Sequence, residues 1–147
     1  MTPHRAQAAL AEAVVRALAA GDVLALQRLV SPSVIDHSSR PGQPAGFSGV
    51  RERAMTLCAQ MPDSDVVVDV LASDQDTVLA RAGLTAVRRP AAPGADPTTA
   101  RATVVLVLRF AGELLTELWT TSDTFDAPAP QRARTSAFSR VAGLAAR

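Results

Sequence analysis

The sequence predicts an α+β domain in which a strongly bent, mixed or antiparallel sheet wraps around three N-terminal helices. Apolar residues repeat at helical spacing in the first 60 positions and at strand spacing from Asp65 onward. The strand signal is strongest in a hairpin within residues 100–125, whose first strand, Ala102–Phe110, is apolar on both parities. We therefore expect both faces of that strand to be covered. The chain has 147 residues and is 48% hydrophobic, which suits one such domain.

Three helices are predicted before residue 62. The first runs from Pro3 to Ala20 and stops at Gly21, with Leu10, Val14 and Leu18 on one face. Asp22 caps a second helix that ends before Pro32, and its inward residues are Val23, Leu26, Leu29 and Val30. Ser48 caps a third helix, Gly49 to Gln60, whose shared face carries Val50, Ala54, Leu57 and Met61.

The strands are predicted around these helices. A short strand, Val34–His37, precedes a loop over Ser38–Gly49 that is rich in Gly, Pro and Ser. After the third helix, Asp65–Leu71 and Thr77–Arg88 form a hairpin, and the connection Arg89–Thr99 carries three prolines. We expect that connection to be a mobile flap at a cavity mouth or an exposed tip. The last strand is Leu114–Phe125, after a turn at residues 111–113.

The domain is expected to occupy residues 1–126. Residues 127–147 form an Arg-, Ala- and Pro-rich tail with several Arg and no acid. We expect weak order there, with room for one short helix around Ser136–Ala146.

Composition excludes several function classes. A net charge of +1, from 15 basic and 14 acidic residues, provides no field for nucleic acid or a membrane surface. Glu12 and Arg16 interrupt the apolar N-terminal stretch, so a signal sequence or membrane span is not expected, and we predict a cytoplasmic protein. Cys58 suits a buried hydrophobe, and His4 and His37 are too far apart for a metal motif. No phosphate loop or Gly-flanked nucleophilic Ser is present, and we expect no metal and no cofactor.

Several short motifs together resemble a known family. They are Ala-Gly-Asp-Val-Leu-Ala-Leu (20–26), Val-Ile-Asp-His-Ser (34–38), Gly49-Val-Arg, Met61-Pro-Asp63, Asp76-Thr-Val-Leu-Ala-Arg81 and the stretch 112–123. Their order over residues 8–125 resembles the SnoaL-like polyketide cyclases of the nuclear transport factor 2-like superfamily. The resemblance implies a cone with a cavity between the helices and the concave sheet, often in a homodimer. It also implies a cofactor-free enzyme that closes a polyketide ring or converts a related small molecule.

The chain departs from this family at positions that matter for chemistry. Relatives that move protons often carry a carboxylate where this chain has Ser38. No Tyr is present, the His often found before the last-strand Trp is absent from residues 117–118, and Ala82 replaces the aromatic that commonly follows Arg81. We therefore expect a roomy, unusually apolar cavity.

Three residues are candidate acids or bases: His37, Asp36 and Asp123. Histidine is suited to proton transfer near neutral pH, and either Asp could orient it or act as the base in a pocket of low dielectric. Adjacent strand residues face opposite sides, so Asp36 and His37 are not expected to enter the cavity together. The alternative is structural: the acids satisfy loop amides at strand ends, and His37 is a packed wall residue.

The candidate substrate-binding residues are mainly apolar. We expect the cavity to be lined by Val14, Leu18, Met55, Met61, Leu106 and Trp119, with His37 at its polar end. Trp119 could stack on a conjugated substrate or pack in the core. Ser38 could donate its hydroxyl to an enolate oxygen. Arg81 could anchor a substrate carboxylate, or form a salt bridge on the outer face of the sheet.

The leading functional hypothesis is a cyclase that folds an apolar, unsaturated polyketide chain, with ring closure by an intramolecular [4+2] cycloaddition. Such a reaction needs no proton transfer and suits a pocket poor in acids and bases. Within enzymes, the alternatives are aldol or Michael closure with His37, Asp36 or Asp123 as base, and epoxide opening. Outside enzymes, the same fold could serve as a non-catalytic small-molecule-binding module.

Overall fold

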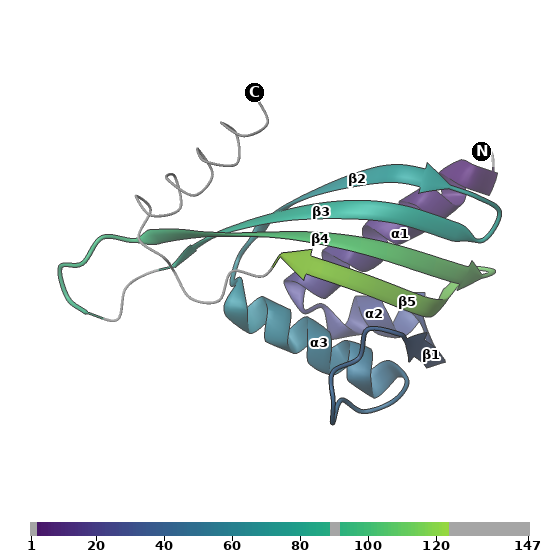
Figure 1. Ribbon diagram of the computed structural model, residues 1–147, viewed down its shortest axis with the longest axis horizontal. Helices are drawn as coiled ribbons and strands as arrows, with labels where there is room; N and C mark the ends of the chain where they lie inside the picture. The colour runs from purple at the N-terminus through teal and green to yellow at the C-terminus, as the bar shows by residue number, and fades with distance from the viewer. Residues whose placement is uncertain (1–2, 89–91, 124–147) are drawn as a thin grey trace, which may run out of the picture.

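The computed structural model describes residues 3–88 and 92–123 and confirms the predicted α+β class (Figure 1). The described part contains three helices and five strands. In chain order they are α1 (Pro3–Ala20), α2 (Val23–Leu29), β1 (Val30–Asp36), α3 (Phe47–Gln60), β2 (Asp65–Ser73), β3 (Thr77–Arg88), β4 (Thr98–Ala111) and β5 (Leu114–Asp123).

The strands form one open, curved sheet in the order β1-β5-β4-β3-β2. β1 runs parallel to β5, and the remaining neighbours are antiparallel. The helices lie against one face of this sheet (Figure 1). The core fills the space between them and includes Val14 and Leu18 of α1, Leu26 of α2, Leu108 of β4 and Leu118 of β5.

The first two helices form as predicted. Gly21 has a positive φ of 64°, which allows α1 to end and the chain to turn within two residues. The Asp22 side chain then accepts a hydrogen bond from the Ala25 backbone N–H at 3.0 Å, and so caps α2. The prediction that Val30 belongs to this helix is wrong. Val30 is extended (φ −118°, ψ 132°) and is the first residue of β1.

The third helix begins differently from the prediction. Its N-cap is Gly46, with no side-chain capping bond, and the predicted cap Ser48 lies inside the helix. The cause is close packing of the loop against β1, because a Cβ on Gly46 would lie 2.7 Å from the Pro32 carbonyl oxygen. Gly46 also has a positive φ of 68°. Both the lack of space for a Cβ and the backbone geometry therefore favour glycine over a polar capping residue.

The expectation that both faces of Ala102–Phe110 are covered is wrong. In β4, Ala102, Leu106 and Leu108 are buried against the helices, whereas the alternate residues Thr103 and Val105 are exposed. The helices cover only one face of the sheet. The apolar side chains that point to the other face are therefore not covered by any described helix.

The predicted connection after β3 is shorter than expected, because Thr98 and Thr99 belong to β4 and pair with Arg88 and Val87. Residues 92–97 are exposed, and residues 89–91 lie outside the described part. The end of the predicted last strand at Phe125, the tail 127–147 and its helix at 136–146 also lie outside it. None of the described helices is long and apolar enough to cross a bilayer.

Candidate functional site

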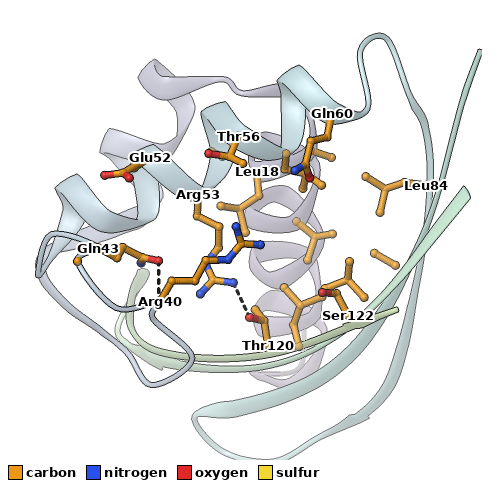
Figure 2. Close-up of a pocket in the computed structure, with 18 of the residues that line it drawn as sticks. Leu18, Arg40, Gln43, Glu52, Arg53, Thr56, Gln60, Leu84, Thr120 and Ser122 are labelled. Carbon is orange, nitrogen blue, oxygen red and sulfur yellow. Dashed lines mark hydrogen bonds between the residues drawn. The ribbon is translucent and has the colours of Figure 1, made fainter. Parts of the chain in front are cut away.

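A pocket of about 270 Å³ lies between the helices and the concave face of the sheet (Figure 2). Its size is close to the lower end of the roughly 300 to 1,000 Å³ typical of small-molecule sites. The lining residues come from α1, the loop after β1, α3 and strands β3 to β5: Val15, Leu18, Ala19, Arg40, Pro41, Gly42, Gln43, Glu52, Arg53, Ala54, Thr56, Leu57, Gln60, Ala82, Leu84, Val104, Leu106, Thr120 and Ser122.

One wall of the pocket is apolar. Leu18 of α1 and Leu84 of β3 lie across the space from each other (Figure 2), and Leu106 of β4 also lines it. Ala82 contributes only a methyl group to this wall. A hydrocarbon chain can therefore pack against this wall without burying an unpaired polar group of the protein.

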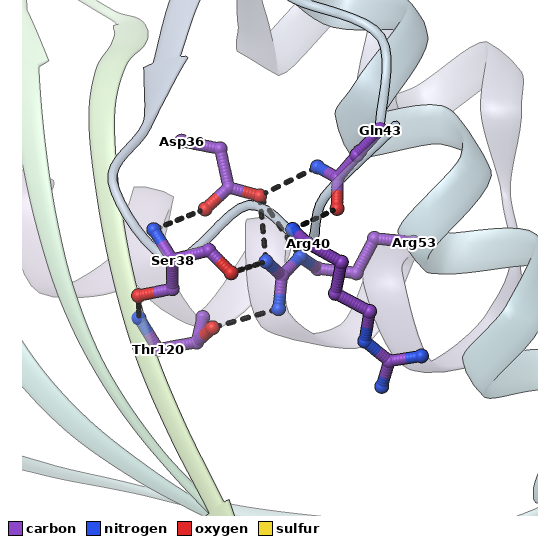
Figure 3. A network of polar contacts seen from close by, with 6 residues as sticks. All are labelled: Asp36, Ser38, Arg40, Gln43, Arg53 and Thr120. Atoms are coloured by element: carbon purple, nitrogen blue, oxygen red, sulfur yellow. Dashed lines mark hydrogen bonds and ion pairs between the residues drawn. The ribbon is translucent and has the colours of Figure 1, made fainter.

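The opposite end of the pocket is organised by Arg53 of α3 (Figure 3). Its Nε and Nη2 donate to Asp36 Oδ2 at 3.0 and 2.7 Å, and Nη2 also donates to the Ser38 carbonyl oxygen at 2.8 Å. Its Nη1 donates to Thr120 Oγ1 at 2.8 Å. An Arg has five N–H donors, so one N–H on Nη1 remains for a ligand.

Asp36 serves this end as a positioning residue. Only 6% of its side chain is exposed, and its carboxylate also accepts from the Ser38 backbone N–H (3.0 Å) and Gln43 Nε2 (2.9 Å). Both carboxylate oxygens are thus engaged, so Asp36 holds Arg53 and the following loop in place.

Thr120 and Ser38 complete the polar end. The Thr120 backbone N–H donates to Ser38 Oγ at 2.9 Å, which ties the loop after β1 to β5. Because Thr120 Oγ1 accepts from Arg53, its own hydroxyl hydrogen is left to donate to a ligand. Ser38 itself is not a lining residue, so its predicted contact with substrate gains no support.

The predicted cavity residues divide into three groups. Leu18 and Leu106 line the pocket as expected. Val14 and Met61 are buried in the core without lining it, and Met55 points to solvent with 52% of its surface exposed. The third helix places Met55 one position beyond its inward residue Ala54, which explains why Met55 faces outward.

The prediction that His37 and Trp119 line the cavity is wrong. Thr120 faces the pocket, so its neighbour Trp119 lies on the outer face, paired with Val107. His37 stacks on Trp119 there, with ring centroids 4.2 Å apart and an interplanar angle of 5°. Arg109 lies 5.6 Å above the indole, and Glu117 is 3.7 Å from His37 Nε2. The expectation that Asp36 and His37 face opposite sides holds.

Two further candidates also lie away from the pocket. Arg81 forms a salt bridge with Asp69 at 2.9 Å on the outer face, as the structural interpretation of this residue predicted. Asp123 is exposed at the end of β5, opposite Thr103. Neither side chain points into the pocket, because both residues occupy strand positions whose side chains point to the outer face of the sheet.

Sequence reasoning missed the polar end, and the pocket, at about 270 Å³, is smaller than the roomy cavity that was expected. Arg53 lies three residues after the buried Val50, so it flanks the inward face of α3. That spacing was the available signal. Nothing local marked Arg40 and Gln43 in the loop, because their position depends on tertiary packing. No group of three His, Cys, Asp or Glu side chains that could hold a metal ion exists within the described ranges.

Known proteins share this architecture. A polyketide cyclase, so assigned, from Bacillus cereus ATCC 10987 superposes with a TM-score of 0.66 at 19% identity, covering 80% of this chain and 74% of its own. One from Acidithiobacillus ferrooxidans gives 0.62 at 25% identity, covering 84% and 92%. IdmH from Streptomyces antibioticus gives 0.64 at 23% identity, covering 80% and 91%. No curated protein matches the sequence.

The amino-acid sequence supports a more specific family assignment than the fold alone. It matches the SnoaL-like polyketide cyclase family over residues 8–129, a span that includes every residue lining the pocket. With the curved sheet, the helices on one face and the pocket between them, this match shows that the chain belongs to the SnoaL-like polyketide cyclase family.

Proposed function

We propose that this protein is a polyketide cyclase that folds an unsaturated chain inside the pocket and closes a ring by an intramolecular [4+2] cycloaddition. The observation that carries the proposal is the pairing of an apolar wall with fixed hydrogen-bond donors at one end. The wall would hold the hydrocarbon part of the chain, and the donors would hold an oxygen.

Folding the chain would supply a large share of the rate. A flexible polyene rarely brings its two reactive ends together in water, whereas a chain confined between Leu18 and Leu106 would have few other shapes. Holding reacting groups in contact can contribute about 7 to 11 kcal/mol in favourable cases. The pocket is small enough to impose such confinement.

The donors would supply the rest. The free N–H on Arg53 Nη1 and the Thr120 hydroxyl could both donate to a carbonyl conjugated with the dienophile, drawing electron density from it. Asp36 fixes the guanidinium in advance, so no reorganisation is needed during reaction. One preorganised donor is typically worth about 10² to 10³ in rate.

The proposed reaction balances without a co-reactant. Three C=C bonds of the diene and dienophile become one C=C bond and two new C–C bonds, and no proton or leaving group moves. The product has the mass of the substrate.

Base-catalysed aldol closure is less well supported by the geometry. His37 and Asp123 face away from the pocket, and Asp36 lies behind Arg53 with both oxygens engaged. Glu52 is the carboxylate that lines the pocket, and it is exposed. An aldol route would therefore have to use a base other than the three that the sequence suggested.

The proposal includes a homodimer in the cytoplasm. The resemblance to relatives supports the homodimer, and the uncovered outer face adds to that support, because Val67 and Val87 there are 64% and 63% exposed. Light scattering on the purified protein would measure a mass near twice 15.3 kDa if the dimer forms, and near 15.3 kDa if it does not.

The experiment is incubation of the purified protein with a linear polyene that carries a conjugated carbonyl, and separately with a linear poly-β-ketone. We expect conversion of the polyene to a product of unchanged mass. Arg53→Lys should lower kcat by about 10², because Lys cannot reproduce the forked contacts. The exposed outer-face change Arg101→Lys is the control. Conversion only of the poly-β-ketone, with loss of water, would favour aldol closure, and binding without conversion would favour a binding module.

A further inference from the structure

The pocket contains a second guanidinium, that of Arg40, which the cyclase proposal does not use. Arg40 lies on the loop after β1 and lines the pocket, and its side chain extends toward the pocket in Figure 2. Arg53 is neutralised by Asp36 at 2.7 Å. Among the residues that the structure describes, the Arg40 guanidinium has no hydrogen-bond or ion-pair partner.

The acidic residues near this end do not neutralise Arg40. Asp36 is committed to Arg53, Gln43 and the Ser38 N–H. Glu52 lines the pocket from α3 but forms no ion pair with Arg40, and Figure 2 shows its side chain lying apart from that of Arg40. Arg40 is an exposed residue at the pocket, and a cation there without a protein counter-ion is available to an anionic ligand.

The backbone that carries Arg40 is held in place. The Arg40 N–H donates to Gln43 Oε1 at 3.3 Å, and Gln43 Nε2 donates in turn to the buried Asp36 carboxylate at 2.9 Å (Figure 3). The root of the Arg40 side chain is thus linked to the same carboxylate that fixes Arg53. The Arg40 backbone and the Arg53 guanidinium therefore belong to one connected polar network.

We infer that Arg40 binds a carboxylate of the substrate, so that the enzyme takes an unsaturated free acid in preference to its ester, thioester or amide. The inference rests on the proposed function, because it names the substrate class of the same pocket. The planar fork of Arg matches the two charged oxygens of a carboxylate with two parallel hydrogen bonds, whereas a neutral ester or amide offers one strong acceptor oxygen and no negative charge. The hydrocarbon part would then extend along the apolar wall at Leu18 and Leu106.

The test uses two probes of equal chain length, octanoate and octanamide, titrated into the protein by calorimetry at pH 7.5. We expect octanoate to bind about tenfold or more tightly than octanamide, as a hydrogen-bonded charge pair outweighs a neutral one. Arg40→Gln should remove that preference while leaving octanamide affinity unchanged. Arg101→Gln, an exposed Arg on the outer face, should preserve the preference.

Three results would overturn the inference: equal affinity of the two probes for the natural protein, an unchanged preference in Arg40→Gln, or no binding of octanoate. Arg40→Glu gives an independent test, because it should lower the affinity for octanoate and leave the affinity for octanamide unchanged. Leu106→Trp separates this inference from the proposed function. If both probes bind equally and Leu106→Trp blocks both, the carboxylate anchor fails while the pocket still holds a chain. If Leu106→Trp affects neither probe, the chain-binding pocket of the proposed function fails as well.

Discussion

Arg53 donates two hydrogen bonds to a single oxygen of Asp36, from Nη2 at 2.7 Å and from Nε at 3.0 Å. The pair joins the middle of α3 to the end of β1, with 23% of the Arg53 side chain and 6% of the Asp36 side chain exposed. Because it is largely desolvated, it fixes the polar end of the pocket relative to the sheet.

Removing both partners of this pair should cost less than the sum of the two single removals. Asp36→Asn leaves a mostly buried guanidinium without a counter-ion, and we expect a loss of about 3 kcal/mol, the low end for breaking a buried pair. Arg53→Met should cost at least as much, since Asp36 is the more buried partner. The double variant should be less destabilised than the sum of the single variants. Urea unfolding of all four proteins measures this coupling.

The control for this cycle is the exposed pair between Arg81 and Asp69, whose side chains are 53% and 48% exposed. Asp69→Asn should change stability by less than about 1 kcal/mol, as exposed pairs generally do. Equal losses for Asp36→Asn and Asp69→Asn would show that the buried pair has no special structural role.

Filling the pocket should abolish turnover without unfolding the protein. Leu106→Trp places an indole where the chain is proposed to fold, so kcat/KM should fall by at least about 10², which corresponds to lost confinement of only a few kcal/mol. Val105→Trp is the matched control, because Val105 is the next residue on β4 and is 37% exposed on the outer face. Similar activity for the two variants would contradict the assignment of the pocket.

Replacing His37 or Trp119 should leave the chemistry nearly intact. Both rings lie on the outer face, so His37→Ala should change kcat by less than about threefold, against the 10² to 10⁴ expected for loss of a general base. Trp119→Ala should lower the free energy of unfolding by about 1 to 2 kcal/mol through lost stacking and packing, with KM unchanged. Steady-state kinetics and urea unfolding give both values. A near-inactive His37→Ala variant would restore the acid–base mechanism.

Gly49 should resist substitution although it lies within a helix. A Cβ at this position would overlap the Pro44 carbonyl oxygen, in the loop that carries Arg40 and Gln43. Gly49→Ala should therefore destabilise the protein by about 1 to 3 kcal/mol, the usual cost of overpacking. Gly83→Ala, in β3, meets no atom within 4 Å and should be neutral or slightly stabilising. Thermal unfolding compares the two variants. Equal melting temperatures would show that the loop at Pro44 moves to accommodate the added methyl group at no cost in stability.

The fold could be predicted from the sequence because its determinants are local. The helical period before Met61, the Asp22 cap and the strand period after Asp65 fixed the class and most element boundaries. Coverage of the sheet could not be read in this way. The apolar residues of β4 occupy both parities, and only the arrangement of the helices decides which parity is buried.

The site was harder to predict, because its residues meet through tertiary contacts. Leu18 and Leu106 follow from periodicity, whereas Arg53 and Thr120 are 67 positions apart and meet only after β5 aligns beside β1. His37 and Trp119 attracted attention by residue type. Their side is set by strand parity, which at Trp119 depends on the register of β5 against β4.

The most direct test of the proposed chemistry is the mass of the product formed in D₂O from a linear polyene with a conjugated carbonyl. Cycloaddition moves no proton, so the product should have the mass of the substrate and carry no deuterium on carbon beyond that in an enzyme-free control. A product that has lost water, or that carries deuterium introduced by the enzyme, would show that an enolate forms and would contradict the account.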